Sequence, residues 1–167
     1  MKAMDAELYA LSGKVGDALK SRKVMMAAAE SCTGGWIGQA VTMVPGSSKW
    51  FDRGFVTYTN DAKQDMLGVS GATLKEYGAV SEQTVREMVA GALERSKAQV
   101  AVAVSGIAGP DGGTKAKPVG TVMLAWGTKG GAIRAQSVHF MGDRDAVRRQ
   151  TVFAALEGVL ALLGEKA

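Results

Sequence analysis

Apolar residues recur along the chain at two spacings, and the two alternate. Near the start, apolar positions lie three or four residues apart, as on one face of an amphipathic helix: Leu8, Leu11, Val15 and Leu19. The unbroken apolar run 24–29 follows and is typical of a buried strand. Helical spacing returns from Thr33 onward. This succession predicts a sheet with helices packed on it.

The same alternation continues to the end of the chain. Further strands are predicted at 54–59, 99–104, 121–126 and 133–140. The turn 129–131 joins the last two strands and predicts an antiparallel hairpin. The chain is therefore expected to form an α/β layered domain. Because no linker or low-complexity segment interrupts it, we expect a single domain, 1–167.

Three further helices are predicted between and after these strands. The first is short, is capped by Asn60 and Asp61, and carries Lys63 and Met66. The second begins at Ser81 and has an apolar face of Val85, Met88, Val89 and Leu93. The last begins near Asp143, and its inward-facing residues are expected to be Val147, Thr151, Ala154, Leu156 and Leu160.

Composition narrows the class of protein. Hydrophobic residues make up 47% of the chain and charged residues 22%, which is ordinary for a globular domain. No apolar run approaches the ~20 residues that a membrane helix needs, so we expect no membrane association. The lone cysteine, Cys32, has no internal disulfide partner, and the N-terminus lacks a basic segment followed by an apolar one. Both observations favour a cytoplasmic protein.

The charge balance mildly favours anionic ligands. The 20 Lys and Arg residues exceed the 16 Asp and Glu residues, which gives a formal charge of +4. Aromatic residues make up only 6% of the chain, and no dense basic run has aromatics within it, so nucleic acid is not an expected partner. Arg144, Arg148 and Arg149 form the tightest basic cluster, and such a cluster is commonly a solvated helix face.

The turn 29–35, with the sequence A-E-S-C-T-G-G, joins the first buried strand to the next helix. A serine in such a turn lies beside unpaired backbone N–H groups, and the helix dipole there favours negative charge. Glycines let these amides approach a ligand closely. This one turn therefore offers a nucleophile, Ser31, together with an oxyanion cradle and a phosphate cradle.

A second turn repeats the pattern of the first. Residues 29–35 read A-x-S-x-x-G-G, and residues 103–109 read A-x-S-x-x-A-G after another predicted strand. Ligands of open α/β sheets bind outside the carboxyl ends of strands, so two such turns would face one crevice. The alternative is two unrelated tight turns.

Counting residue types narrows the chemistry. His139 is the chain's one histidine, and a lone histidine on a strand is usually structural. No cluster has the spacing of metal ligands, and the glycine motifs of ATP and dinucleotide sites are missing, so no metal or cofactor is expected. What remains is nucleophilic catalysis with a base other than histidine, and a lysine can serve a serine in this way if burial or positive neighbours lower its pKa.

Lys63 is the best-placed base for Ser31, since it follows a strand that is expected to end at the same edge. Tyr58 could relay a proton or orient the lysine. The alternative is that Lys63 is an ordinary exposed helix residue. Cys32 is a rival nucleophile because a helix N-terminus lowers the pKa of a thiol, with a buried packing role as its alternative.

Six segments together resemble one family: A-E-S-C-T-G-G-W, G-F-V-T-Y-T-N-D-A-K, G-A-V-S, S-G-I-A-G-P-D-G-G, K-P-V-G-T-V and G-D-R-D-A-V-R-R-Q. The chain is similar to the CinA C-terminal domain family, whose stand-alone members are nicotinamide-nucleotide amidases. Nothing in it corresponds to the N-terminal molybdopterin-binding-like domain of full-length CinA proteins, so we expect the stand-alone enzyme. The resemblance implies a three-layer α/β/α sandwich with a mixed, mostly parallel five-stranded sheet.

The resemblance also implies an activity. Family members hydrolyse the carboxamide of nicotinamide mononucleotide (NMN) to nicotinic acid mononucleotide and ammonia, within the pyridine nucleotide (NAD) cycle. They are metal-independent serine amidohydrolases, and the matching catalytic positions here are Ser31, Tyr58 and Lys63. The tetrahedral oxyanion is expected to bind the backbone amides of Cys32, Thr33, Gly34 and Gly35.

The 5′-phosphate of this substrate is expected to bind at the second turn. Candidate ligands are the hydroxyl of Thr33 or Ser105 and backbone N–H groups of 106–113, including Gly106, Gly109 and Gly112. Arg144 is the favoured arginine because its fork donates two parallel hydrogen bonds, with Arg148 and Arg149 as alternatives.

The sequence leaves alternative roles for two acidic residues. Glu30 either orients the site, bonds the ribose or is structural, and Asp111 either contacts the ribose or shapes the turn after Pro110.

The alternative functions are a nucleotide-binding module without turnover and an interaction protein of DNA uptake or damage response. We expect a homodimer, with Trp36 or Trp50 exposed at its interface.

Overall fold

One sheet of five strands forms the centre of the protein, in a computed structural model that describes residues 5–167; the first four positions of the predicted domain lie outside them. The strands are β1 (Met26–Glu30), β2 (Phe51–Val56), β3 (Val100–Gly106), β4 (Thr121–Thr128) and β5 (Ile133–His139). Their order is β2-β1-β3-β4-β5. β1 pairs in parallel with β2 and β3, whereas β4 pairs antiparallel with β3 and β5. The predicted mixed sheet and its hairpin are confirmed, although only half of these pairings are parallel.

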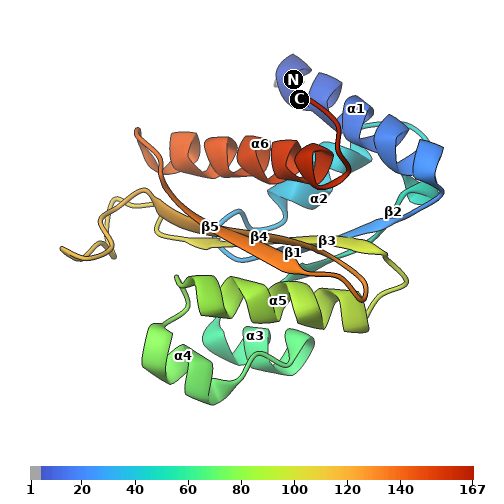
Figure 1. Ribbon diagram of the computed structural model, residues 1–167. Helices are drawn as coiled ribbons and strands as arrows, with labels where there is room; N and C mark the ends of the chain where they lie inside the picture. Colours follow the sequence, from blue (N-terminus) through green and yellow to red (C-terminus); the bar gives the residue numbers. More distant parts are fainter. Residues whose placement is uncertain (1–4) are drawn as a thin grey trace.

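Helices cover both faces of the sheet (Figure 1). On one face lie α1 (Ala6–Arg22), α2 (Trp36–Thr42) and α6 (Arg144–Leu162). On the other lies α5 (Glu82–Glu94), with α3 (Asn60–Leu67) and α4 (Gly71–Tyr77) on the same side. A short 3₁₀ helix, η1 (Ser47–Lys49), precedes β2. This is the three-layer α/β/α sandwich that the resemblance implied.

The central strand β3 is buried on both faces, which explains its unbroken apolar sequence. Successive side chains of a strand point to opposite faces. Val100, Val102 and Val104 accordingly pack into the core under α1, α2 and α6. Ala101 and Ala103 pack into the second core, under α5. One strand thus joins two hydrophobic cores.

Side-chain caps fix where the helices begin. Ser81 and Asp143 cap α5 and α6 as predicted. The Ser81 hydroxyl accepts the Thr84 N–H at 3.1 Å, and the Asp143 carboxylate accepts the Ala146 N–H at 2.9 Å. The short helix α3 is capped one residue earlier than predicted. Its cap is Thr59, whose hydroxyl accepts the Ala62 N–H at 3.1 Å, so Asn60 is already helical.

Two local predictions are wrong, and one helix was not predicted. Strand β2 lies three residues earlier than 54–59 because its polar residues suit a sheet edge: Asp52 accepts the Lys97 N–H at 3.0 Å, and Arg53 bonds the Arg95 carbonyl at 3.2 Å. Helix α4 was not expected, since it buries one apolar side chain, Leu74, and so shows no periodicity. On α6 the fully buried alanine is 155, whereas 154 is half-buried.

Neither tryptophan offered for a dimer interface is exposed. Trp50 is 1% exposed, and its indole lies so close to Gly16 of α1 that a Cβ there would be 2.6 Å from it. Trp36 is half-buried, with the Arg148 guanidinium 5.4 Å from its ring centroid. The homodimer therefore stays a prediction, and neither tryptophan supports it.

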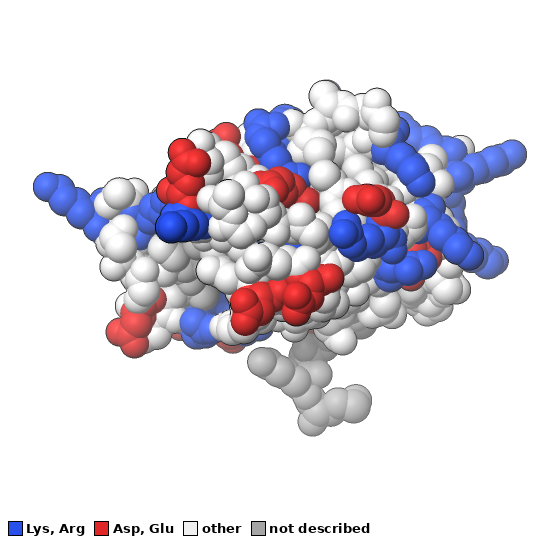
Figure 2. All heavy atoms as spheres, turned by 90° about the horizontal axis from the view of Figure 1, so that it is seen from below, with Lys and Arg blue, Asp and Glu red and all other residues white. Residues whose placement is uncertain are grey.

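The surface carries both signs of charge. On the face seen in Figure 2, which lies over α3, α4 and α5, basic and acidic side chains are interspersed. Within residues 5–167, no helix combines the length and the apolar character needed to cross a membrane.

The candidate site lies where three neighbouring parallel strands end. Glu30 of β1 pairs with Val56 of β2 and Val104 of β3, so the three chains leave the sheet together. Ser31 and Tyr58 follow the ends of β1 and β2, and Ser105 is the next-to-last residue of β3. The fold therefore brings Ser31, Ser105 and helix α3, which carries Lys63, to one edge of the sheet, as the sequence predicted.

Candidate active site

The turn after β1 presents Ser31 at the edge of the sheet. The Ser31 N–H still bonds the Val104 carbonyl at 3.1 Å, and the Ser31 carbonyl accepts the Gly34 N–H at 3.0 Å. Gly34 and Gly35 then adopt φ angles of 61° and 101°, in the left-handed region that favours glycine. The two glycines therefore allow the chain to reverse sharply into α2 and leave the Ser31 side chain at the strand end.

Lys63 is buried beside this serine. It lies one turn into α3, is 1% exposed, and its Nζ is 2.9 Å from Ser31 Oγ. The same nitrogen donates to the carbonyls of Thr57 and Tyr58, at 2.8 and 3.2 Å. Burial lowers the pKa of Lys63 from its ordinary value of 10.5. The alternative of an exposed helix lysine is therefore wrong.

Tyr58 reaches the site through its main chain. Its carbonyl oxygen accepts from Lys63 and lies 3.4 Å from Ser31 Oγ. Its side chain is 57% exposed, and its hydroxyl accepts from Arg144 Nη2 at 3.1 Å. Among residues 5–167 the Tyr58 hydroxyl has no hydrogen bond to Lys63, so the part of Tyr58 that contacts the lysine is its carbonyl, and its hydroxyl contacts Arg144.

The three clustered arginines have three different contacts. Arg144 begins α6 and donates from Nη1 to the Gly109 carbonyl at 2.8 Å. Arg148 donates to the carbonyls of Cys32 and Thr33, in the turn after β1. Arg149 bonds Asp5 at 2.7 Å and Glu7 at 3.0 Å, and its bond holds the pKa of Asp5 below the usual range. Arg144 is therefore the one of these three that faces the site.

A cavity of about 200 Å³ connects these groups. Its polar lining includes Ser31, Lys63, Ser105 and Arg144. Within residues 5–167 no Asp or Glu lines it, so the cavity suits a ligand that carries or develops negative charge.

Part of the apolar wall of this cavity was not expected from the sequence. Ala79 and Val80 form it before α5, and Ala108 forms it after β3. Ala79 and Val80 could have been identified as candidates from the sequence, since both lie in the G-A-V-S segment that resembles the family. Gly106 also lines the cavity, but a Cβ there would lie 2.6 Å from Val122 Cγ2, so close packing on β4 already requires this glycine.

Glu30 serves the fold of the turn. Its carboxylate is 1% exposed and accepts the Thr33 hydroxyl at 2.6 Å and the N–H groups of Ile37 and Gly38 at 2.8 and 3.1 Å. The N-terminus of α2 is thus occupied by a carboxylate of the protein itself. The expected phosphate cradle at this helix start and the phosphate bond from the Thr33 hydroxyl are wrong, and the structural alternative for Glu30 fits.

The amides of the turn differ in availability. The Gly34 N–H is used by the Ser31 carbonyl. Within residues 5–167, the N–H groups of Cys32, Thr33 and Gly35 have no acceptor. These three therefore stay candidates for an oxyanion. The Cys32 thiol is buried, which raises its pKa to about 11 and keeps it protonated at neutral pH.

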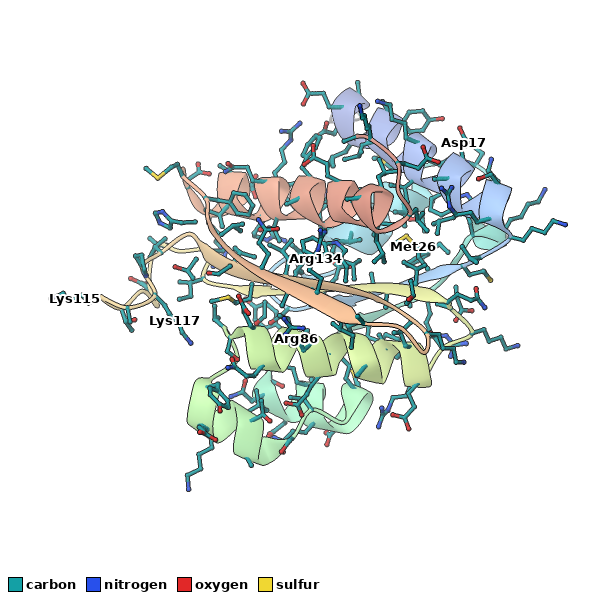
Figure 3. All side chains as sticks on the ribbon, in the orientation of Figure 1. Asp17, Met26, Arg86, Lys115, Lys117 and Arg134 are labelled. Atoms are coloured by element: carbon teal, nitrogen blue, oxygen red, sulfur yellow. The ribbon has the colours of Figure 1, made fainter. Side chains whose placement is uncertain are left out.

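The loop after β3 extends away from the cavity. Asp111 and Gly112 are exposed and do not line the cavity, and Lys115 lies at the far tip of this loop (Figure 3). Gly109 contributes a carbonyl, which Arg144 binds, rather than the expected amide. Asp111 therefore fits the alternative of shaping the turn better than a ribose contact.

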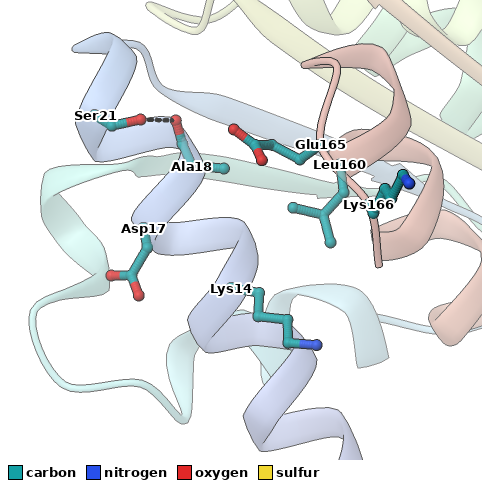
Figure 4. A pocket seen from close by; sticks show the side chains of 7 residues that line it. All are labelled: Lys14, Asp17, Ala18, Ser21, Leu160, Glu165 and Lys166. Atoms are coloured by element: carbon teal, nitrogen blue, oxygen red, sulfur yellow. Dashed lines mark hydrogen bonds between the residues drawn. The ribbon is translucent and has the colours of Figure 1, made fainter.

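Other candidate sites offer less chemistry. His139 is exposed and has its Nε2 2.8 Å from the Val119 carbonyl, as a structural histidine does. Within residues 5–167, no three His, Cys, Asp or Glu side chains are grouped to hold a metal ion. A hollow of about 320 Å³ between α1 and the C-terminal segment (Figure 4) has one hydroxyl, that of Ser21, and it bonds the Ala18 carbonyl at 2.9 Å.

Comparison with known proteins gives consistent results. Residues 8–163 match the family described as CinA C-terminal domain. The chain is 54% identical over 153 residues to "Nicotinamide-nucleotide amidohydrolase PncC" of Escherichia coli (strain K12), covering 92% of this chain and 93% of that protein. It is 53% identical over 152 residues to the protein of that name from Pseudomonas putida, covering 91% and 94%. The crystal structure of the competence/damage inducible protein CihA from Agrobacterium tumefaciens superposes with a TM-score of 0.94 at 46% identity, covering 99% of this chain and 100% of that one.

Proposed function

The chain belongs to the CinA C-terminal domain family, and from this premise we propose that it is a nicotinamide-nucleotide amidase. It would hydrolyse the carboxamide of NMN to nicotinic acid mononucleotide and ammonia, in the pyridine nucleotide cycle. The observation that carries the proposal is the 2.9 Å contact between Lys63 Nζ and Ser31 Oγ in a buried cavity. The amidohydrolase names of relatives that are more than half identical supply the substrate.

Lys63 Nζ is placed to act as a base in its neutral form. In the structure Nζ donates to the Ser31 hydroxyl and to the carbonyls of Thr57 and Tyr58. A neutral amine keeps two N–H bonds, which the two carbonyls can accept, and its lone pair then faces the Ser31 hydroxyl proton. Lys63 takes this proton while Ser31 Oγ bonds to the carboxamide carbon, and the electron pair of the C=O bond moves to the oxygen.

The resulting oxyanion binds two of the three free amides of the turn, those of Cys32 and Thr33. Collapse of this intermediate breaks the C–N bond, and the Lys63 ammonium gives its proton to the departing ammonia. Water, deprotonated by Lys63, then attacks the acyl-enzyme and restores the Ser31 hydroxyl. The positive pyridinium ring withdraws electrons from the carboxamide, so the reaction needs no metal ion.

The phosphate of the substrate is assigned to Arg144. Within residues 5–167 no carboxylate pairs with this guanidinium, which is held by the Gly109 carbonyl and the Tyr58 hydroxyl. Its remaining N–H groups can bind a phosphate at the mouth of the cavity. Ser105, which is buried in the lining, is a candidate for a further polar contact.

Ammonia release from NMN by the purified protein, with EDTA present, tests this proposal. We expect turnover of NMN and far slower turnover of free nicotinamide, which lacks the ribose phosphate and the pyridinium charge. The Arg144→Ala variant is expected to bring the two substrates closer together by raising KM for NMN. Absence of ammonia from a folded sample would contradict the proposed function.

A further inference from the structure

Arg148 lies against the turn 31–35 and is not one of the residues that line the cavity. It donates from Nε to the Cys32 carbonyl and from Nη2 to the Thr33 carbonyl, both at 3.1 Å. Its guanidinium stacks over the Trp36 ring, 5.4 Å from the centroid, and its Nη1 lies 3.6 Å from Asp145. These contacts hold the guanidinium in one place.

The two carbonyl contacts determine where the amides of the turn point. In a trans peptide unit, the C=O and N–H bonds point in opposite directions. Because the Cys32 carbonyl points at Arg148, the N–H of Thr33 in the same peptide unit points away from it. The Thr33 carbonyl accepts both from Arg148 and from the Trp36 N–H, each at 3.1 Å, and the Gly34 N–H of its peptide unit reaches the Ser31 carbonyl at 3.0 Å. The Thr33 N–H thus points away from Arg148, and within residues 5–167 it has no acceptor.

Glu30 fixes the other end of the same turn. It binds the first amides of α2, at Ile37 and Gly38, as well as the Thr33 hydroxyl. The turn is therefore held between a buried carboxylate on its amide side and a guanidinium on its carbonyl side. A cation on the carbonyl oxygen also polarises the peptide unit and strengthens its N–H as a donor.

We propose that Arg148 is a positioning residue for the amidase reaction. By binding the Cys32 and Thr33 carbonyls, it aims the Thr33 amide at the oxyanion that forms when Ser31 attacks. The inference rests on the proposed function for the substrate and on the geometry of the turn for the role of Arg148. The planar fork of arginine suits two carbonyls at once, whereas a lysine is a point charge without that fork.

The test compares Arg148→Ala and Arg148→Lys with a matched control, Arg149→Ala. The control removes a neighbouring arginine of α6 that bonds Asp5 and Glu7 instead of the turn. Two quantities are measured: kcat and KM for NMN, and the rate at which a fluorophosphonate labels Ser31. In the labelling reaction Ser31 Oγ bonds to phosphorus, fluoride leaves and Lys63 takes the hydroxyl proton, so no NMN is needed.

We expect Arg148→Ala to lower kcat and the labelling rate together by about 10²- to 10³-fold, as loss of one oxyanion donor does. KM should change little, guanidinium ion should restore part of the lost rate, and Arg149→Ala should behave as wild type. A raised KM with unchanged labelling would overturn the proposal, since Arg148 would then bind substrate. Unchanged values in both assays would overturn it as well.

Two further results keep the test decisive. If the wild-type protein is labelled at Ser31 but releases no ammonia from NMN, the substrate assignment fails and the labelling rates still decide the role of Arg148. If Arg148→Ala does not fold, as judged by circular dichroism, Arg148→Lys carries the same comparison. A folded Arg148→Lys protein with wild-type kcat and wild-type labelling would overturn the proposal.

Discussion

The turns that follow β1 and β3 share one sequence pattern but differ in their surroundings. Ala29 pairs with Ala103 across two neighbouring parallel strands, so Ser31 and Ser105 come at matching positions in the two chains. Both serines are nearly buried, at 8% and 1% exposure, and both line the cavity. Pattern, register and burial do not distinguish them.

What distinguishes the two serines is the base and the backbone beside them. Ser31 has Lys63 Nζ at 2.9 Å, and its chain then turns through left-handed glycines into a helix. Ser105 remains in the ladder of β3 opposite Met123 of β4, and within residues 5–167 no lysine bonds its hydroxyl. A serine turn becomes a candidate nucleophile here through its neighbours, and the repeated pattern alone is not enough.

Removing the base is the change expected to weaken this distinction most. Lys63→Met keeps a long side chain but has no nitrogen to accept the Ser31 proton, so kcat for NMN should fall by about 10²- to 10⁴-fold. The matched control is Lys115→Met, at the exposed tip of the loop after β3, which should retain activity. Turnover near wild type in Lys63→Met would rule out this lysine as the base.

The pH dependence of activity should show the same base. Burial lowers the pKa of Lys63 below 10.5, and the neutral amine is the form that accepts a proton. We therefore expect kcat/KM to rise with pH through the pKa of the folded protein and to level off above it. An acid limb that persists unchanged in any residual activity of Lys63→Met would assign the titration to another group.

Stability should follow pH in the same direction. Between the lowered pKa in the folded protein and 10.5, the unfolded chain holds the Lys63 proton and the folded protein does not. The free energy of unfolding therefore rises with pH across that window, and this contribution is absent from Lys63→Met. Chemical denaturation of both proteins across that window, starting from neutral pH, measures the difference.

Loosening the turn at Glu30 should have an intermediate effect. Glu30→Gln places an amide NH₂ group where the carboxylate accepts from Thr33, Ile37 and Gly38, which should cost about 1–3 kcal/mol in the free energy of unfolding. Activity should also fall, because the same bonds hold the turn. Glu157→Gln, on the exposed side of α6, is the control expected to leave both quantities unchanged. A fully stable and active Glu30→Gln protein would contradict the role given to this carboxylate.

The turn, the place of Lys63 beside it and the shared edge could be predicted from the sequence, because each follows from where a predicted strand ends. Ser31 follows an apolar run and precedes two glycines, and Lys63 follows the end of another strand. The contacts of the arginines could not be predicted in this way. Arg144 and Arg148 are four residues apart on α6, so helical spacing places both on one face. Only the packing of α6 beside the two turns brings the first to Gly109 and the second to Cys32.

The orientation of Glu30 was unpredictable for a related reason. A carboxylate next to a nucleophile suits a catalytic role and a structural role equally well in sequence. Its direction depends on where α2 begins relative to β1, and this is a property of the packed turn. Strand β2 was misplaced because Asp52 and Arg53 bond the neighbouring segment at the sheet edge, which conceals the strand pattern.

Changing the rival nucleophile should have the smallest effect. The Cys32 thiol has a pKa raised to about 11 by burial, so very little thiolate is present at neutral pH. Cys32→Ala should retain most of the ammonia release from NMN, with a modest loss of stability from the small cavity it leaves. Loss of activity on the scale expected for Ser31 would return the thiol to consideration as the nucleophile.

The most direct test of the account compares Ser31→Ala and Ser105→Ala in the ammonia assay. Loss of a serine nucleophile lowers kcat by about 10⁴-fold or more, and Ser31→Ala is expected to show that loss. Ser105→Ala should keep kcat near wild type and change chiefly KM, because Ser105 lines the cavity without a base. Turnover that survives in Ser31→Ala and disappears in Ser105→Ala would contradict the account.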